Sequence, residues 1–91
     1  MAYQIVDADY VLDHLGTLPL VDVRPGFMYE ESRIPGAISI QLIEAKESLR
    51  DTAEYFVEGF TDANLNSQDE FIVYCYDGGL AREACDLLES Q

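Results

Sequence analysis

Short, continuous runs of apolar residues alternate along the chain with longer segments in which apolar residues recur at helical spacing. The clearest run spans residues 71–74 (Phe-Ile-Val-Tyr), and a second run spans residues 18–23. Continuous apolar runs are typical of strands that are buried on both faces of a parallel sheet. The pattern predicts strands at residues 4–6, 18–23, 37–40 and 71–74.

Helical spacing is clearest near the end of the chain, where Ala81, Ala84, Cys85 and Leu88 follow the i, i+3, i+4, i+7 rule. Other segments with helical character lie between the predicted strands, and residues 61–70 are polar and resemble a loop. We predict helices at residues 10–15, 27–32, 41–60 and 81–88. Alternating strands and helices indicate an α/β fold with a mostly parallel sheet.

Composition and charge narrow the class of protein. The chain has 91 residues, which is the size of one domain, and 48% of them are hydrophobic, too many for a disordered acidic tail. Eighteen acidic residues against five basic ones give a formal net charge of −13. The five basic residues are scattered, which argues against binding to nucleic acid or to an anionic membrane. The beginning of the chain lacks the features of a signal peptide, so we expect a cytoplasmic protein.

Candidate chemistry centres on Cys75, which directly follows the predicted strand 71–74 and precedes two glycines and a helix. Active sites of parallel sheets lie at the carboxyl ends of the strands. Backbone N–H groups of a glycine-containing loop, together with a helix N-terminus, favour an anion such as a thiolate at this point. A small buried hydrophobic residue that ends a strand would show the same pattern.

Two segments resemble the rhodanese-like domain family. Residues 20–24 (Leu-Val-Asp-Val-Arg) and 29–38 (Tyr-Glu-Glu-Ser-Arg-Ile-Pro-Gly-Ala-Ile) are similar to one family pattern, and residues 73–81 (Val-Tyr-Cys-Tyr-Asp-Gly-Gly-Leu-Ala) are similar to its active-site loop. The resemblance implies a three-layer α/β/α fold with a central sheet of four to five strands. It also implies a sulfurtransferase that carries sulfane sulfur as a persulfide on Cys75.

The same resemblance implies roles for further residues, without a metal or an organic cofactor. Asp22 and Arg24 would tie neighbouring loops together, and Arg33 would lie nearer the solvent and hold one loop to another. The expected partners are small sulfur donors and acceptors or a protein persulfide. The backbone amides that would hold the sulfur belong to Tyr76, Asp77, Gly78, Gly79, Leu80 and Ala81.

The sequence departs from the family pattern in ways that bear on the substrate. Leu80 stands where many active members have an arginine, Asp77 adds a negative charge, and Ser32-Arg33 replaces the usual Gly-His. A dianionic donor such as thiosulfate would be repelled by such a site, so we predict weak use of thiosulfate.

Two other functions stay open. A binding or redox-sensing module would need no efficient catalysis, which agrees with Leu80. A phosphatase or arsenate-reductase-like enzyme is disfavoured because the first arginine after Cys75 is Arg82, one position too late for that family signature, and we expect Arg82 on an exposed helix face.

The remaining predictions concern the chain end and isolated residues. Family members usually continue into a further strand and helix, so residues 1–91 are interpreted as one domain that is a piece of a longer protein or a minimal variant. A homodimer across an open sheet edge is a further option. We expect His14 to be a half-exposed helix residue and Cys85 to lie in the core. Tyr76, on the loop, would line the donor entrance or shield the sulfur.

Overall fold

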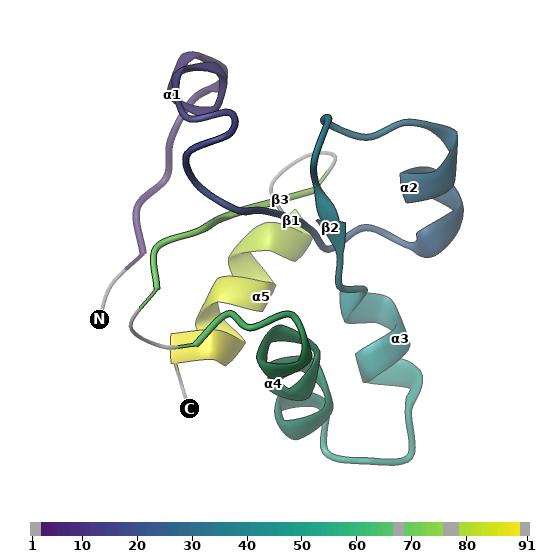
Figure 1. Ribbon diagram of the computed structural model, residues 1–91. Helices are drawn as coiled ribbons and strands as arrows, with labels where there is room; N and C mark the ends of the chain where they lie inside the picture. The colour runs from purple at the N-terminus through teal and green to yellow at the C-terminus, as the bar shows by residue number, and fades with distance from the viewer. Residues whose placement is uncertain (1–2, 67–68, 76–78, 90–91) are drawn as a thin grey trace.

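A three-stranded, all-parallel sheet lies at the centre of the molecule (Figure 1). The computed structural model describes residues 3–66, 69–75 and 79–89. The strands are β1 (Leu20–Asp22), β2 (Ile38–Ser39) and β3 (Ile72–Tyr74), in the spatial order β2-β1-β3. The helices are α1 (Ala8–Asp13), α2 (Gly26–Glu31), α3 (Leu42–Glu47), α4 (Thr52–Asp62) and α5 (Gly79–Glu89).

The central strand β1 sets the register of both neighbours. Asp22 lies opposite Tyr74 on the β3 side, and Val21 lies opposite Ile38 on the β2 side. Because the strands are parallel, their carboxyl ends lie at one edge of the sheet. The register therefore brings the ends of β1 and β3 side by side, directly before Cys75.

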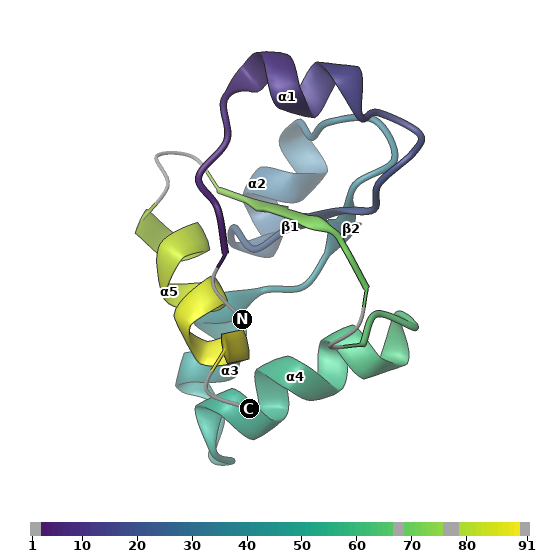
Figure 2. The same cartoon turned by 90° about the vertical axis from the view of Figure 1, so that its left-hand side faces the viewer.

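The helices form layers on both faces of the sheet, as the α/β/α prediction requires (Figure 2). Successive side chains of a strand point to opposite faces. Val21 and Val23 accordingly belong to the larger hydrophobic cluster, together with buried residues of α3, α4 and α5. Leu20 and Ile72 belong to a smaller cluster, which is covered by residues of α1 and α2 among others.

The predicted strand at residues 4–6 is wrong, because this segment forms no strand. It is exposed, with Ile5 at 69% of its maximal surface, and the Tyr3 hydroxyl donates to Asp86 Oδ1 at 3.1 Å. A strand needs a hydrogen-bonding neighbour, and residues 4–6 do not pair with β3, whose outer edge has no strand beside it in the described part of the chain. The sheet therefore has three strands in the described part of the chain, not the four to five that were expected.

The single helix predicted at residues 41–60 is also wrong, because the chain turns between α3 and α4. The Ser48 hydroxyl donates to Ala45 O at 2.9 Å where α3 ends, and the Asp51 side chain accepts from Glu54 N at 3.0 Å where α4 begins. Serine and aspartate favour such local bonds at helix ends. The turn leaves Leu49 fully exposed and lets α3 and α4 pack against each other.

The last helix is close to its prediction. It begins at Gly79, two residues before the expected start, and buries Ala84 completely against the larger cluster. Across the described residues, no helix has the length and apolar character needed to cross a membrane.

Candidate active site

Cys75 lies at the point where β3 ends and the chain leads into α5. Its side chain is half-buried and packs against the larger hydrophobic cluster. The backbone N–H of Ala81 donates to Cys75 Sγ at a distance of 3.3 Å. Ala81 lies in the first turn of α5, where N–H groups have no partner inside the helix. The start of α5 is therefore directed at the sulfur, as the sequence predicts.

The other predicted loop amides divide into two groups. Tyr76, Asp77 and Gly78 lie outside the described residues. Gly79 and Leu80 form the start of α5, and the Leu80 side chain packs against the larger hydrophobic cluster. Since Leu80 contributes to the core, the position that many family members use for an arginine has a structural role in this chain.

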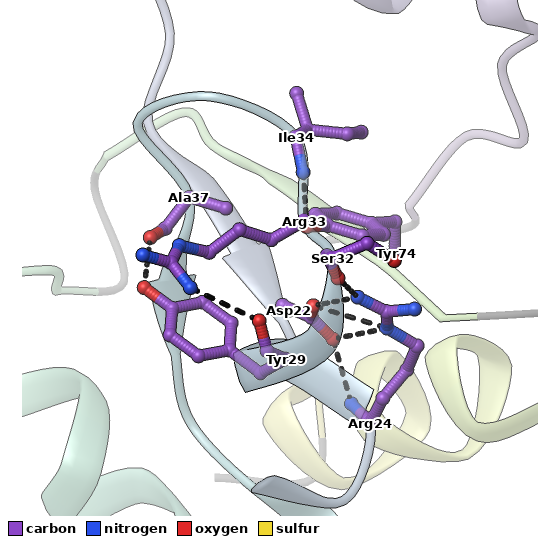
Figure 3. A network of polar contacts seen from close by, with 8 residues as sticks. All are labelled: Asp22, Arg24, Tyr29, Ser32, Arg33, Ile34, Ala37 and Tyr74. Atoms are coloured by element: carbon purple, nitrogen blue, oxygen red, sulfur yellow. Dashed lines mark hydrogen bonds and ion pairs between the residues drawn. The ribbon is translucent and has the colours of Figure 1, made fainter. Parts of the chain in front are cut away.

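Asp22 and Arg24 form a tight ion pair at the carboxyl end of β1 (Figure 3). The Asp22 carboxylate is completely buried and accepts from Arg24 Nη2 at 2.7 Å, from Arg24 Nε at 3.0 Å and from Arg24 N at 2.9 Å. Burial alone raises the pKa of the Asp22 carboxyl group. The hydrogen bonds from Arg24 outweigh burial, so this pKa lies below its ordinary value.

Arg24 also connects β1 to the segment that follows α2. Its Nη2 donates to the backbone oxygen of Ser32 at 2.6 Å, while the same group binds Asp22. The guanidinium group of Arg24 therefore ties two neighbouring segments together, as the family resemblance implies. Because these acceptors hold it in place, it is less available to bind an anionic substrate.

Tyr74, directly before Cys75, has a role that sequence reasoning missed. Its hydroxyl accepts a hydrogen bond from Ile34 N at 3.2 Å, which fixes the end of β3 to the segment after α2 (Figure 3). Burial raises the pKa of Tyr74, and the nearby Asp22 carboxylate adds to the increase. The available signal was the alternation along β3, which places Tyr74 on the face opposite Cys75.

Arg33 is held on the solvent side by contacts with Tyr29. It is exposed, its Nη1 donates to Tyr29 O at 3.1 Å, and its guanidinium carbon lies 4.5 Å from the centre of the Tyr29 ring. The Tyr29 hydroxyl in turn donates to Ala37 O at 2.7 Å. Arg33 therefore lies on the solvent side as expected, but in the described structure its contacts stay within residues 29–33, so the expected clasp between two loops is not confirmed.

Three further residues that the sequence analysis singled out lie at the end of α1 or on α5. His14 is half-buried, its Nδ1 lies 2.7 Å from Tyr10 O, and its ring stacks on Tyr10. Arg82 is exposed on α5, as expected. The prediction that Cys85 lies in the core is wrong, since it is half-buried and belongs to neither hydrophobic cluster. Each residue turns a helix by about 100°, so the full burial of neighbouring Ala84 does not extend to Cys85.

The family model described as "Rhodanese-like domain" matches residues 7–91 of the chain. The chain belongs to the rhodanese-like domain family. No significant match to a curated protein was found, and none to a solved structure. Within this rhodanese-like domain, the strand that precedes Cys75 and the helix that follows it are placed as the resemblance implied.

Proposed function

We propose that this rhodanese-like domain is a sulfurtransferase that carries sulfane sulfur on Cys75. The thiolate of Cys75 attacks the sulfane sulfur of a donor, a new S–S bond forms, and the bond to the rest of the donor breaks. The donor leaves with the electron pair of the broken bond. An acceptor thiolate or cyanide then attacks the outer sulfur of the persulfide and regenerates the Cys75 thiolate.

The observation that supports the proposal best is the 3.3 Å contact between Ala81 N and Cys75 Sγ. An N–H group at a helix start stabilises negative charge, which both the attacking thiolate and the departing thiolate carry. Asp22, Arg24 and Tyr74 hold the strand ends around this point through the bonds described above. They are positioning residues in the proposed mechanism, and none of them has to touch the sulfur.

Intact-mass measurement after treatment with inorganic polysulfide tests the proposal. We expect the protein to gain the mass of one sulfur atom, and cyanide to remove it. The Cys85→Ser variant should keep the gain, whereas Cys75→Ser should lose it. Cys85 is the matched control because it is the other cysteine and is also half-buried. Loss of the gain in Cys85→Ser alone would show that Cys85 carries the sulfur and would refute the proposal. No gain in any protein would refute it as well and would favour a binding module.

Donor charge should decide which small molecules are used. The net charge is −13, and Arg24 and Arg33 are held by Asp22, Ser32 and Tyr29. We expect lower kcat/KM for the dianion thiosulfate than for an alkyl persulfide, which carries one negative charge. Because salt screens repulsion, kcat/KM for thiosulfate should rise more steeply with sodium chloride than kcat/KM for the persulfide. Equal salt slopes for the two donors in a cyanide-coupled assay would contradict this prediction.

A further inference from the structure

A groove that the proposed sulfur chemistry does not use lies on the side of the molecule formed by β2, α3 and α4. One hollow of about 310 Å³ lies between residues 38–41, which include β2, and helix α4. A second hollow of about 560 Å³ lies between the start of α2 and helix α3. Both hollows are lined by Gln41, Glu44 and Tyr55, so they adjoin. We call the two together the acidic groove.

The lining of the acidic groove combines apolar surface with carboxylates. Ile38 and Tyr55 contribute apolar surface to it, as does Phe27, which is 67% exposed. Among the described residues that line it there are acidic side chains but no lysine or arginine. The acidic residues are Glu44, Glu47 and Asp62.

One basic residue that the structure places beside this lining, Arg50, is already paired. The Arg50 guanidinium carbon lies 5.5 Å from the centre of the Tyr55 ring. Its Nη2 binds Glu58 at 2.8 Å and Glu54 at 3.2 Å. The charge of Arg50 is thus directed at two carboxylates outside the groove lining, Glu54 and Glu58, and it does not neutralise the acidic residues of the lining.

The groove also runs along an edge of the sheet. Strand β2 is the outermost strand on this side in the described part of the chain. Ile40 N donates to Asp22 O at 3.0 Å and Leu42 N donates to Val23 O at 3.3 Å, both toward β1. Backbone groups of alternate residues in a strand point in opposite directions. The backbone groups of Ser39, which lines the first hollow, therefore point away from β1, and an extended chain could bind them there. Gln41 O, by contrast, accepts from Ala45 N at 3.4 Å at the start of α3.

We propose that the acidic groove binds an extended segment of a partner protein in which lysine or arginine residues alternate with apolar ones. The carboxylates bind the basic side chains, and the apolar lining accepts the others. The charge complementarity identifies this occupant, because a second copy of the chain would also carry a net charge of −13 and would be repelled. The proposal is independent of the sulfur chemistry at Cys75.

Fluorescence anisotropy with a labelled Lys-Val-Lys-Val-Lys-Val peptide tests this site on the whole chain. We expect saturable binding that weakens at least tenfold in the double variant Glu44→Gln/Asp62→Asn. The control Glu30→Gln/Asp13→Asn removes the same charge from exposed positions on α2 and α1 and should change the affinity less than twofold. Amide NMR shifts on titration should be largest around Ser39, Gln41 and Gly59, and circular dichroism should show both variants folded.

Three results would overturn the proposal. If both double variants bind the peptide equally more weakly than wild type, the peptide is attracted to the net charge of the protein and not to the groove. Absence of saturable binding would show that the groove does not take such a segment. A dimer in sedimentation equilibrium that dissociates only in Glu44→Gln/Asp62→Asn would identify a second copy as the occupant. N-methylation of alternate peptide amides should weaken binding if the peptide adds to the edge of β2, and unchanged affinity would exclude that geometry.

Discussion

Replacing Asp22 with asparagine is expected to lower the free energy of unfolding by about 3 kcal/mol, because it breaks a buried ion pair from one side. Asp22 is completely buried and accepts hydrogen bonds from the side chain and backbone of Arg24. Asparagine has nearly the same shape, but its amide group presents hydrogens to the donors of Arg24. The Arg24 side chain is only 11% exposed, so water compensates little for the lost carboxylate. Urea unfolding measures the change.

A matched substitution and a double-mutant cycle isolate the contribution of the Asp22–Arg24 ion pair to stability. Asp13→Asn makes the same chemical change at an exposed position on α1, and it should alter stability by less than about 0.5 kcal/mol. Combining Asp22→Asn with Arg24→Gln should cost less than the sum of the two single changes. If the losses of stability in the two single variants add up to the loss in the double variant, the two side chains stabilise the fold separately. The ion pair would then not be the cause of the destabilisation.

The same pair predicts how stability depends on pH. The pKa of Asp22 is lowered in the folded state, so folding favours the ionised form. This contribution is fully present above the ordinary aspartate pKa of about 3.9, and it is lost as pH falls through the lower folded value. Wild type should therefore lose stability in acid more steeply than Asp22→Asn. If the free energies of unfolding of the two proteins fall equally steeply with pH below pH 4, this prediction is contradicted.

The parts of the fold that could be predicted from sequence depend on local pattern. The apolar runs that became β1, β2 and β3 are buried in β1 and half-buried to buried in β2 and β3, so the apolar pattern alone was enough to predict them as strands. Residues 4–6 carry a similar pattern but form no strand. The apolar pattern indicates that a segment can form a strand. Whether it does so also depends on whether the rest of the fold places the segment alongside a free strand edge.

The break between α3 and α4 had a local signal that apolar spacing concealed. Leu49 fits the helical repeat of residues 41–60, yet it is fully exposed because the chain turns there. Ser48 and Asp51, whose side chains bond to the helix ends on either side, mark the turn. Residues typical of helix ends, such as Ser48 and Asp51, therefore indicate a break in a long periodic segment more strongly than a single apolar residue that fits the repeat indicates continuity.

The residues of the candidate site could be predicted from the sequence, but the hydrogen bonds between distant residues could not. Cys75, Asp22 and Arg24 lie at neighbouring strand ends, as the order of strands and helices predicts. The bond between Tyr74 and Ile34 joins residues that are 40 positions apart. Such a bond follows from the register of β3 against β1, which no local pattern contains.

Removing the single N–H group of Ala81 is expected to slow the chemistry of Cys75 by roughly tenfold to a hundredfold. A hydrogen bond to a charged group contributes about 1.5–3 kcal/mol, and the Ala81 N–H is the donor that the structure places 3.3 Å from Cys75 Sγ. The group can be removed by joining a thioester of residues 1–74 to a synthetic peptide of residues 75–91, in which lactic acid replaces Ala81. Cys75 itself supplies the thiol for this ligation.

The measurement is the second-order rate of alkylation by iodoacetamide and of persulfide formation, both in a Cys85→Ser background. The matched control places the ester one residue earlier, at Leu80, which lies in the same turn of α5 and whose N–H is not bonded to the sulfur in the described structure. Both esters weaken the start of the helix similarly, so a general loss of helix would slow both proteins. A slower rate in the Ala81 ester alone would show that this N–H stabilises the charged sulfur. Equal rates in the two esters would instead mean that the helix start positions Cys75 without stabilising its charge.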